Sequence, residues 1–182
     1  INSTKWHAIE EILLDSIANK RYENDVKILF MKLRYADYYE KRLRKKNVIQ
    51  RASAIDKLGK MRCERATEKL IPLLKDENPE IVTVTVRSLS KIGSPIGLRS
   101  ILDGIPKFLF RPLVTVKTIE TSLANFGKAA IPSLVEYCGI YPEPMCKALV
   151  LEILSTLKAL EAVPLALSNL SHQDPEVRSK AL

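Results

Sequence analysis

The fold is decided by the stretch Ile81-Val-Thr-Val-Thr-Val-Arg-Ser-Leu89-Ser-Lys-Ile92-Gly93, whose apolar skeleton recurs along the chain of 182 residues. The Leu89 position returns as Leu58, Leu123 and Leu154, and the Ile92 position returns as Met61, Phe126 and Leu157. Neighbouring copies are 31, 34 and 31 residues apart. Residues three apart lie on one face of an α-helix. The stretch therefore predicts an amphipathic helix that is repeated at a near-constant spacing.

A second apolar helix is expected after each of these first helices. Its apolar residues have an i, i+1, i+4 spacing, which makes a stripe broad enough to face a core. The four copies of the stripe are Leu70, Ile71 and Leu74; Ile101, Leu102 and Ile105; Leu134, Val135 and Cys138; and Ala166, Leu167 and Leu170. Gly93 and Gly127 are expected in the turn between the two helices, where a left-handed residue is favoured.

Proline marks where the first helices begin. Pro79, Pro144 and Pro175 keep the register, and Pro112 is one residue out of it. Proline suits the first helical turn, because its missing N–H would have no partner there. The first helices are therefore predicted to start near residues 47, 79, 112, 144 and 175, with the last pair truncated.

The repeat indicates an all-α fold. One helix pair cannot bury its apolar face alone, whereas stacked pairs bury a continuous one. No strand-like alternation appears, and a generic helical bundle would not repeat its skeleton about every 31 residues. We therefore expect a right-handed α-solenoid over residues 47–182. Residues 1–46 do not fit the repeat, and they are predicted to form a helical cap over the exposed end of the stack.

Two stretches carry a family resemblance. Asp174-Pro-Glu-Val-Arg178-Ser-Lys-Ala-Leu and Lys75-Asp-Glu-Asn-Pro-Glu-Ile resemble the start of a HEAT repeat of the short bacterial kind, which is also found in phycobilisome lyase subunits. In that pattern an arginine pairs with an acidic residue of a neighbouring loop. The matching positions are Arg51, Val82, Val116, Lys147 and Arg178. Two of them are valine, so the resemblance, which covers about residues 36–182, implies a broken charge ladder.

The front of the repeat region resembles a narrower group. The stretch from Tyr38 to Ala52, leading into Asp56-Lys-Leu-Gly59, is similar to bacterial HEAT-repeat proteins in which a membrane-spanning helix precedes a cytoplasmic repeat domain. This resemblance implies a cytoplasmic location and a membrane tether outside the given sequence. Within the sequence, no apolar run reaches the roughly 18–20 residues that cross a bilayer.

The net charge of +8 is concentrated at the front, where residues 1–60 contribute +6. Six cations form a basic patch within eleven residues: Lys41, Arg42, Arg44, Lys45, Lys46 and Arg51. Two interpretations stay open for it. The patch is either a solvated helix end, or a contact for anionic lipid or an acidic partner.

Motifs of catalysis and metal binding are missing from the sequence. There is no Gly-rich phosphate loop, no G-x-S-x-G and no H-E-x-x-H. The three cysteines lack a C-x-x-C spacing, and His7 and His172 lie near opposite ends. We therefore expect no cofactor, no metal site and no enzymatic activity, with the cysteines serving as small buried hydrophobes of a reduced cytosolic protein.

The function favoured by the sequence is a protein-interaction scaffold, because solenoids present an extended surface built from their second helices. The partner-binding candidates are Arg65, Lys69, Arg99, Tyr137, Phe108 and Phe110. The two phenylalanines lie in a three-residue insertion before Pro112, and either they anchor a partner or they pack into the core between repeats. Nucleic-acid binding is the alternative that the net charge favours, but acids lie beside the bases on the expected surface.

The C-terminal end adds an expectation about association. Asp174-Pro175 starts a first helix whose partner helix is missing from the sequence. Val177, Ala181 and Leu182 should face the preceding repeat, with nothing over their far side. Uncovered apolar surface promotes association. We expect the native chain to continue past Leu182, and we expect weak self-association through the C-terminal face.

Overall fold

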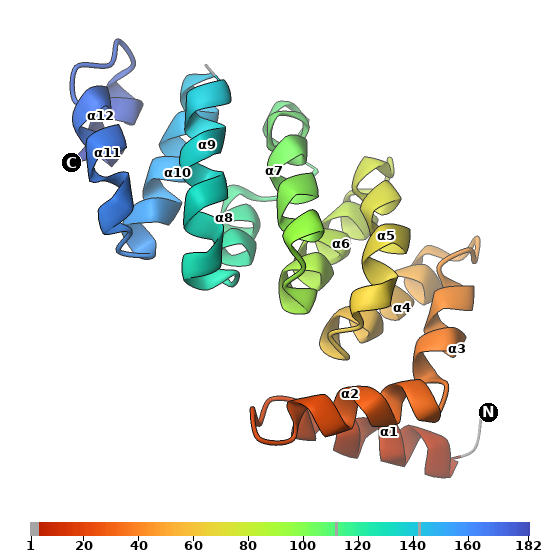
Figure 1. Cartoon of the computed structure of the whole chain (residues 1–182). Helices are drawn as coiled ribbons and strands as arrows, with labels where there is room; N and C mark the ends of the chain where they lie inside the picture. The colour runs from red at the N-terminus through yellow and green to blue at the C-terminus, as the bar shows by residue number, and fades with distance from the viewer. Residues whose placement is uncertain (1–3, 112, 142) are drawn as a thin grey trace.

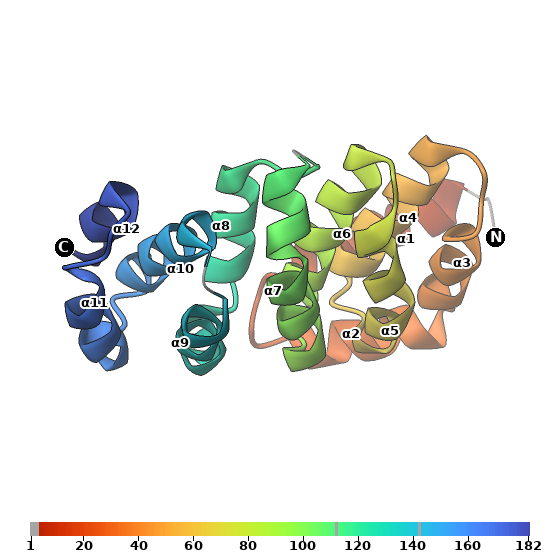
Figure 2. The ribbon, with the colours of Figure 1, turned by 90° about the horizontal axis from the view of Figure 1, so that it is seen from above.

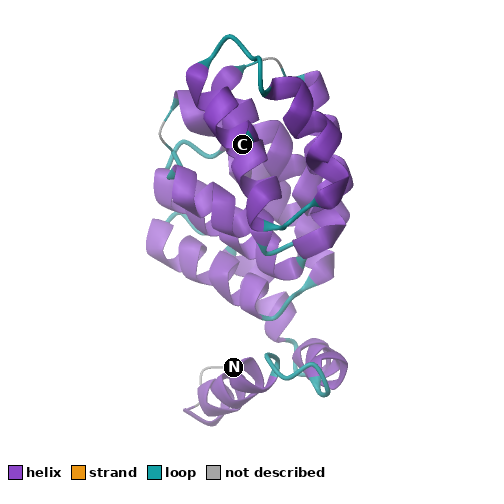
Figure 3. Ribbon diagram, turned by 90° about the vertical axis from the view of Figure 1, so that its left-hand side faces the viewer, coloured by secondary structure: helices purple, strands orange, loops and turns teal. Residues whose placement is uncertain are grey.

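The structure is a computed structural model, and it describes residues 4–111, 113–141 and 143–182. All regular elements in these ranges are helical, as Figure 3 shows. The α-helices are α1 (Thr4–Ser16), α2 (Glu23–Lys32), α3 (Tyr35–Arg42), α4 (Val48–Lys60), α5 (Thr67–Leu70), α6 (Pro79–Ile92), α7 (Pro95–Phe110), α8 (Val116–Ala124), α9 (Ile131–Ile140), α10 (Pro144–Thr156), α11 (Val163–Asn169) and α12 (Pro175–Ala181). Four 3₁₀-helices join them: η1 (Glu64–Ala66), η2 (Ile71–Lys75), η3 (Gly127–Ala130) and η4 (Leu160–Ala162).

The helices stack in two rows, which Figures 1 and 2 show from two directions. The first helices of the pairs, α4, α6, α8, α10 and α12, form the outer row, and each contacts the next. The second helices, α5, α7, α9 and α11, form the inner row, which α3 continues at its N-terminal end. The recurring leucines Leu58, Leu89, Leu123 and Leu154 are all buried between the rows. The predicted all-α solenoid is thereby confirmed.

Local sequence signals set the helix starts. Pro79 and Pro175 occupy the first turns of α6 and α12, and the side chains of Asn78 and Asp174 accept hydrogen bonds from the free backbone N–H groups there. The start expected near residue 112 falls outside the described residues. Helix α8 begins only at Val116, because the Thr115 side chain caps it by accepting from the N–H of Thr118.

The chain before α4 divides into two parts. Helix α3 packs on α4, at the N-terminal end of the stack. Helices α1 and α2 form a hairpin that lies below the stack in Figure 3 and crosses the lower ends of the first pairs in Figure 1. Lys57 and Arg62 at the end of α4 pair with Glu10 of α1 at 3.1 Å and with Glu23 of α2 at 2.5 Å. The hairpin therefore covers the edge of the stack, and α3 lies at its end.

An aromatic cluster fixes the hairpin to α3. The Trp6 ring stacks on the Tyr35 ring with a centroid distance of 4.1 Å, and the Tyr35 hydroxyl donates to the Trp6 carbonyl oxygen at 2.5 Å. Tyr35 is fully buried, so this contact combines apolar burial with a satisfied polar group. Contacts with α1 of the hairpin thus help to fix α3 at the start of the inner row.

Candidate protein-interaction surface

The inner row of second helices forms the candidate surface, and it exposes only part of the predicted set. Arg65, Lys69, Arg99 and Phe110 have exposed side chains. Tyr137 and Phe108 are buried, with 4% and 1% of their surface exposed. The expectation that Tyr137 points outward is therefore wrong, and of the two alternatives for Phe108 its burial matches packing into the core between repeats.

Tyr137 is buried because it lies on the core side of α9. Leu134 and Cys138 of the apolar stripe flank it along the helix, and both are buried. Its ring stacks on the Tyr141 ring with a centroid distance of 4.2 Å. Burial raises the pKa of the Tyr137 phenol, whose oxygen has no hydrogen-bond partner among the described residues. The side chain supports the wall of the surface and leaves little area for a partner.

The insertion before Pro112 divides its two phenylalanines between core and solvent. Phe108 lies against Gly104, where an added Cβ would approach its ring to 2.4 Å. Phe110 is 79% exposed at the end of α7. Helix α7 continues through Pro106 to Phe110, so helical geometry turns the two residues, which are two positions apart, to different sides. Only Phe110 remains a candidate anchor.

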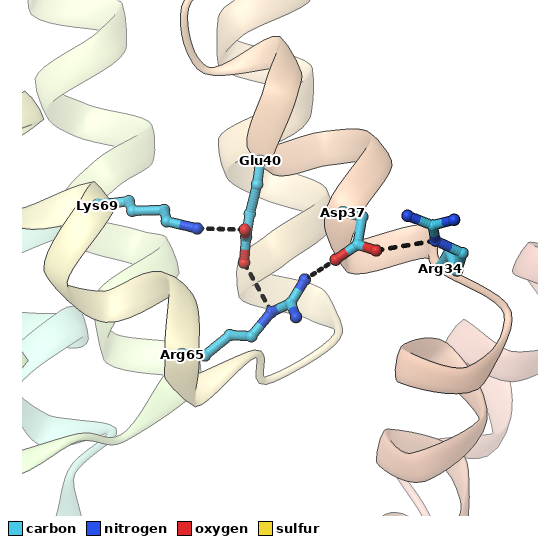
Figure 4. A network of polar contacts seen from close by, with 5 residues as sticks. All are labelled: Arg34, Asp37, Glu40, Arg65 and Lys69. Carbon is cyan, nitrogen blue, oxygen red and sulfur yellow. Dashed lines mark hydrogen bonds and ion pairs between the residues drawn. The ribbon is translucent and has the colours of Figure 1, made fainter.

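Arg65 and Lys69 belong to a polar network that joins α3 to the first inner helix (Figure 4). The Arg65 guanidinium donates to Asp37 and to Glu40, and the Lys69 ammonium donates to Glu40. Arg34 donates to the other Asp37 oxygen at 3.0 Å. The hydrogen bonds from Arg65 and Arg34 lower the pKa of Asp37. Both predicted contact residues therefore hold α3 on α5, a role that their exposure alone does not reveal.

Two of the six cations of the basic patch pair with other side chains of the chain, and the other four do not among the described residues. The Arg42 guanidinium lies 4.3 Å from the Tyr38 ring centroid, and Arg51 donates to Asp76 at 2.8 Å. The other four members have no ion pair within the described parts of the chain: Lys41, Arg44, Lys45 and Lys46. All four are exposed at or just after the end of α3. The patch thus leaves four positive charges free.

Arg51 shows how far the expected charge ladder extends. It pairs with Asp76, which lies in the next inter-helix loop, as the resemblance implies. Arg178 instead donates to the backbone carbonyl oxygens of His172 and Gln173, at 2.8 and 2.9 Å. Lys147 has no ion pair to any described residue. The ladder is therefore broken at Lys147 and Arg178 as well as at Val82 and Val116.

A groove of about 260 Å³ lies between α7 and α9 on the inner row. Arg99, Asp103 and Glu136 line it with exposed charges of both signs, and Ile140 adds an exposed apolar side chain. None of the three charged groups has an ion pair with another described residue. Unlike the α3–α5 network, this part of the inner row keeps its charges available.

The distribution of acids along the inner row bears on nucleic-acid binding. Asp37 and Glu40 lie among the bases at one end, and Asp103 and Glu136 lie in the groove. Phosphate backbones are held by continuous tracks of Lys and Arg. The structure of the inner row gives no support to the nucleic-acid alternative.

The chemistry of the thiols fits a structural role. Cys63, Cys138 and Cys146 are buried free cysteines. Burial raises the pKa of the Cys138 thiol to about 11, so it is protonated near neutral pH and is a poor nucleophile. Among the described residues, no cluster of three His, Cys, Asp or Glu side chains has the geometry to hold a metal ion. Likewise, none of the described helices combines the length and apolar character needed to span a membrane.

Comparison with known proteins identifies the repeat. Residues 39–105 match the family described as HEAT repeats. Among curated proteins, none matches this chain. Of the solved structures, the complex of CpcE and CpcF of phycocyanin lyase from Nostoc sp. PCC7120 is similar, with a TM-score of 0.50 and 23% identity over 80% of this chain.

The given sequence spans 62% of the length of that solved chain. An engineered protein is also similar, with 15% identity, a TM-score of 0.45 and coverage of 94% of this chain and 93% of its own. The likeness to the lyase complex shows the fold, and the repeat match shows its type. The chain is therefore an α-solenoid, and its residues 39–105 are HEAT repeats.

Proposed function

We propose that this chain is a non-enzymatic scaffold that binds a protein partner along its inner row. The observation that carries the proposal is the α7–α9 groove, where Arg99, Asp103 and Glu136 present charges that no described residue neutralises. Exposed side chains of both signs beside Ile140 suit a polypeptide with charged and apolar side chains. HEAT-type stacks present such surfaces over several repeats.

The similarity to the phycocyanin lyase complex supports the fold on which this proposal depends, and no enzymatic activity is inferred from it. Fold alone does not determine activity, because unrelated functions share one architecture. The groove contains no histidine or cysteine among its lining residues, and its charged groups lie on exposed helix faces. Binding by side chains of opposite sign accounts for this arrangement without a reaction.

The experiment tests where a partner contacts the stack. A photo-crosslinking side chain at Ser133, which lines the groove, is expected to capture protein in cells. The same group at Lys117, exposed on outer helix α8, serves as the matched control. Adding Arg99→Glu and Asp103→Arg to the Ser133 version should reduce capture at least about fivefold, since reversed charges repel the partner. Equal capture at the two sites, or capture of nucleic acid at Ser133, would contradict the proposal.

Two further properties belong to the same proposal. A cytoplasmic location suits three buried cysteines that form no disulfide, because reducing compartments keep thiols free. The membrane tether outside the given sequence stays a prediction. Weak self-association through α11 and α12 is supported by exposed leucines there.

A further inference from the structure

A second hollow of the inner row lies between α3 and the first inner helix. It has a volume of about 690 Å³, and its lining includes Arg34, Lys41, Arg44 and Lys69. Leu43 and Leu73 contribute apolar surface to the same hollow. Lys45 and Lys46 follow directly in the chain and are exposed. The hollow therefore combines a basic wall with an apolar floor.

The two acids in the hollow are already engaged. Asp37 accepts hydrogen bonds from Arg34 and Arg65, and Glu40 accepts from Arg65 and Lys69 (Figure 4). Lys41 and Arg44 make no ion pair with any part of the chain that the structure describes. Counting Arg65 with the lining residues, five cations face two acids, so the hollow carries a net charge of +3. The ion pairs of Asp37 and Glu40 neutralise part of the positive charge, and the remaining positive charge of the hollow has no acidic partner among the described residues.

The structure of the chain itself accounts for only part of this charge. Cations near the end of a helix interact favourably with its free carbonyl groups, which explains Lys41 at the end of α3. Arg44, Lys45 and Lys46 follow the helix, and their charges cost free energy through mutual repulsion unless an anion lies nearby. A polyanionic ligand would relieve this repulsion.

We propose that this hollow binds an acidic segment of a partner protein, with carboxylates against Lys41 and Arg44 and an apolar side chain against Leu43 and Leu73. The proposal rests on the scaffold function and names the chemistry of one partner segment. A peptide can follow a concave surface and bring charged and apolar side chains together. A bilayer surface is flat, so it would meet the rim of the hollow and leave the leucines uncovered.

The test measures binding of a fluorescein-labelled peptide that alternates glutamates with leucines, by fluorescence anisotropy at low and physiological salt. The Lys41→Ala/Arg44→Ala variant should bind it about fivefold to thirtyfold more weakly, because two exposed ion pairs are each worth up to about 1 kcal/mol. The control variant Lys20→Ala/Lys128→Ala removes the same charge from exposed positions elsewhere and should change binding less than about twofold. Urea unfolding of both variants checks that the fold is retained.

Three results would overturn the proposal. The first is equal binding of the peptide by the two variants. The second is equal binding of a peptide in which the leucines are replaced by serine, since the apolar floor would then be unused. The third is binding to vesicles rich in phosphatidylserine, lost in Lys41→Ala/Arg44→Ala, without binding of the peptide. Capture at Ser133 in the groove would persist in each case if the scaffold function alone is correct, so the two failures are distinguishable.

Discussion

At the scale of single residues, one backbone position recurs after each of the four complete first helices. It is occupied by Arg62, Gly93, Gly127 and Lys158, with φ of 48°, 75°, 63° and 52°. Left-handed backbone costs an L-residue roughly 1–2 kcal/mol relative to the right-handed form, and glycine avoids that cost. Lys158→Gly is therefore expected to raise the free energy of unfolding by about 0.5–1 kcal/mol, measured by urea denaturation.

Arg62→Gly is the informative comparison for that prediction. Arg62 has the same backbone geometry, but its guanidinium also pairs with Glu23 of the hairpin at 2.5 Å. Loss of that pair should offset the relief of backbone strain, so the gain should be smaller than for Lys158→Gly. A destabilised Lys158→Gly protein would show that the turn does not carry the assumed strain.

At the scale of elements, helices α4 and α6 approach closely through Gly59. A Cβ built on Gly59 would lie 2.6 Å from the Cβ of Ser88, which is closer than two side chains can pack. Gly59→Ala must separate the two helices and loosen the core around Leu58 and Leu89. We expect it to lower the free energy of unfolding by about 1–3 kcal/mol, measured by chemical denaturation.

Gly139 in α9 provides a control, because alanine at this position is not expected to lower the free energy of unfolding. A Cβ there meets no atom within 4 Å, and alanine favours a helix over glycine by about 1 kcal/mol. Gly139→Ala should therefore leave stability unchanged or raise it slightly. Adding Ser88→Gly to Gly59→Ala should recover little of the loss, because the Cα of Ser88 would still lie 2.7 Å from the added Cβ. If Gly59→Ala alone were neutral, close packing would not govern this interface.

At the scale of the whole molecule, the C-terminal end of the inner row exposes apolar side chains that the interior of the row buries. Leu102 in α7 is 3% exposed, whereas its counterpart in the repeat, Leu167 in α11, is 62% exposed. Leu160 and Leu182 are also exposed at this end. Exposed apolar side chains of this kind favour association. Leu160→Lys/Leu167→Lys should raise the dissociation constant of self-association about tenfold or more, measured by sedimentation equilibrium.

Ile49 supplies the control for that measurement. It is an exposed apolar residue on α4, near the other end of the stack. Ile49→Lys should leave the association unchanged if the C-terminal face carries it. A concentration-independent monomeric mass for the unchanged chain would remove the basis for the prediction.

The features that the sequence determined by itself are those with local causes. The apolar faces and the starts at Pro79, Pro144 and Pro175 depend on residues within about one or two helical turns of one another, and the recurrence of this pattern can be read directly from the sequence. The same holds for Gly93 and Gly127, whose left-handed backbone follows from the missing Cβ. Stacking is then the way to bury faces that repeat at this spacing, so the solenoid could be predicted without coordinates.

Other features were decided only by the tertiary structure. Arg65 lies 28 and 25 residues from Asp37 and Glu40, and Lys69 lies 29 residues from Glu40. Spacing in the sequence does not select such partners. The burial of Tyr137 and Phe108 depends on which neighbours pack against α9 and α7, because an aromatic residue at the edge of an apolar stripe fits either side. The hairpin of α1 and α2 lies across the edge of the stack because Leu13, Val26 and Phe30 join the buried core of the stack, and ion pairs to Lys57 and Arg62 add to this contact. Contacts between residues far apart in the sequence therefore determine these positions, because the local sequence is compatible with more than one of them.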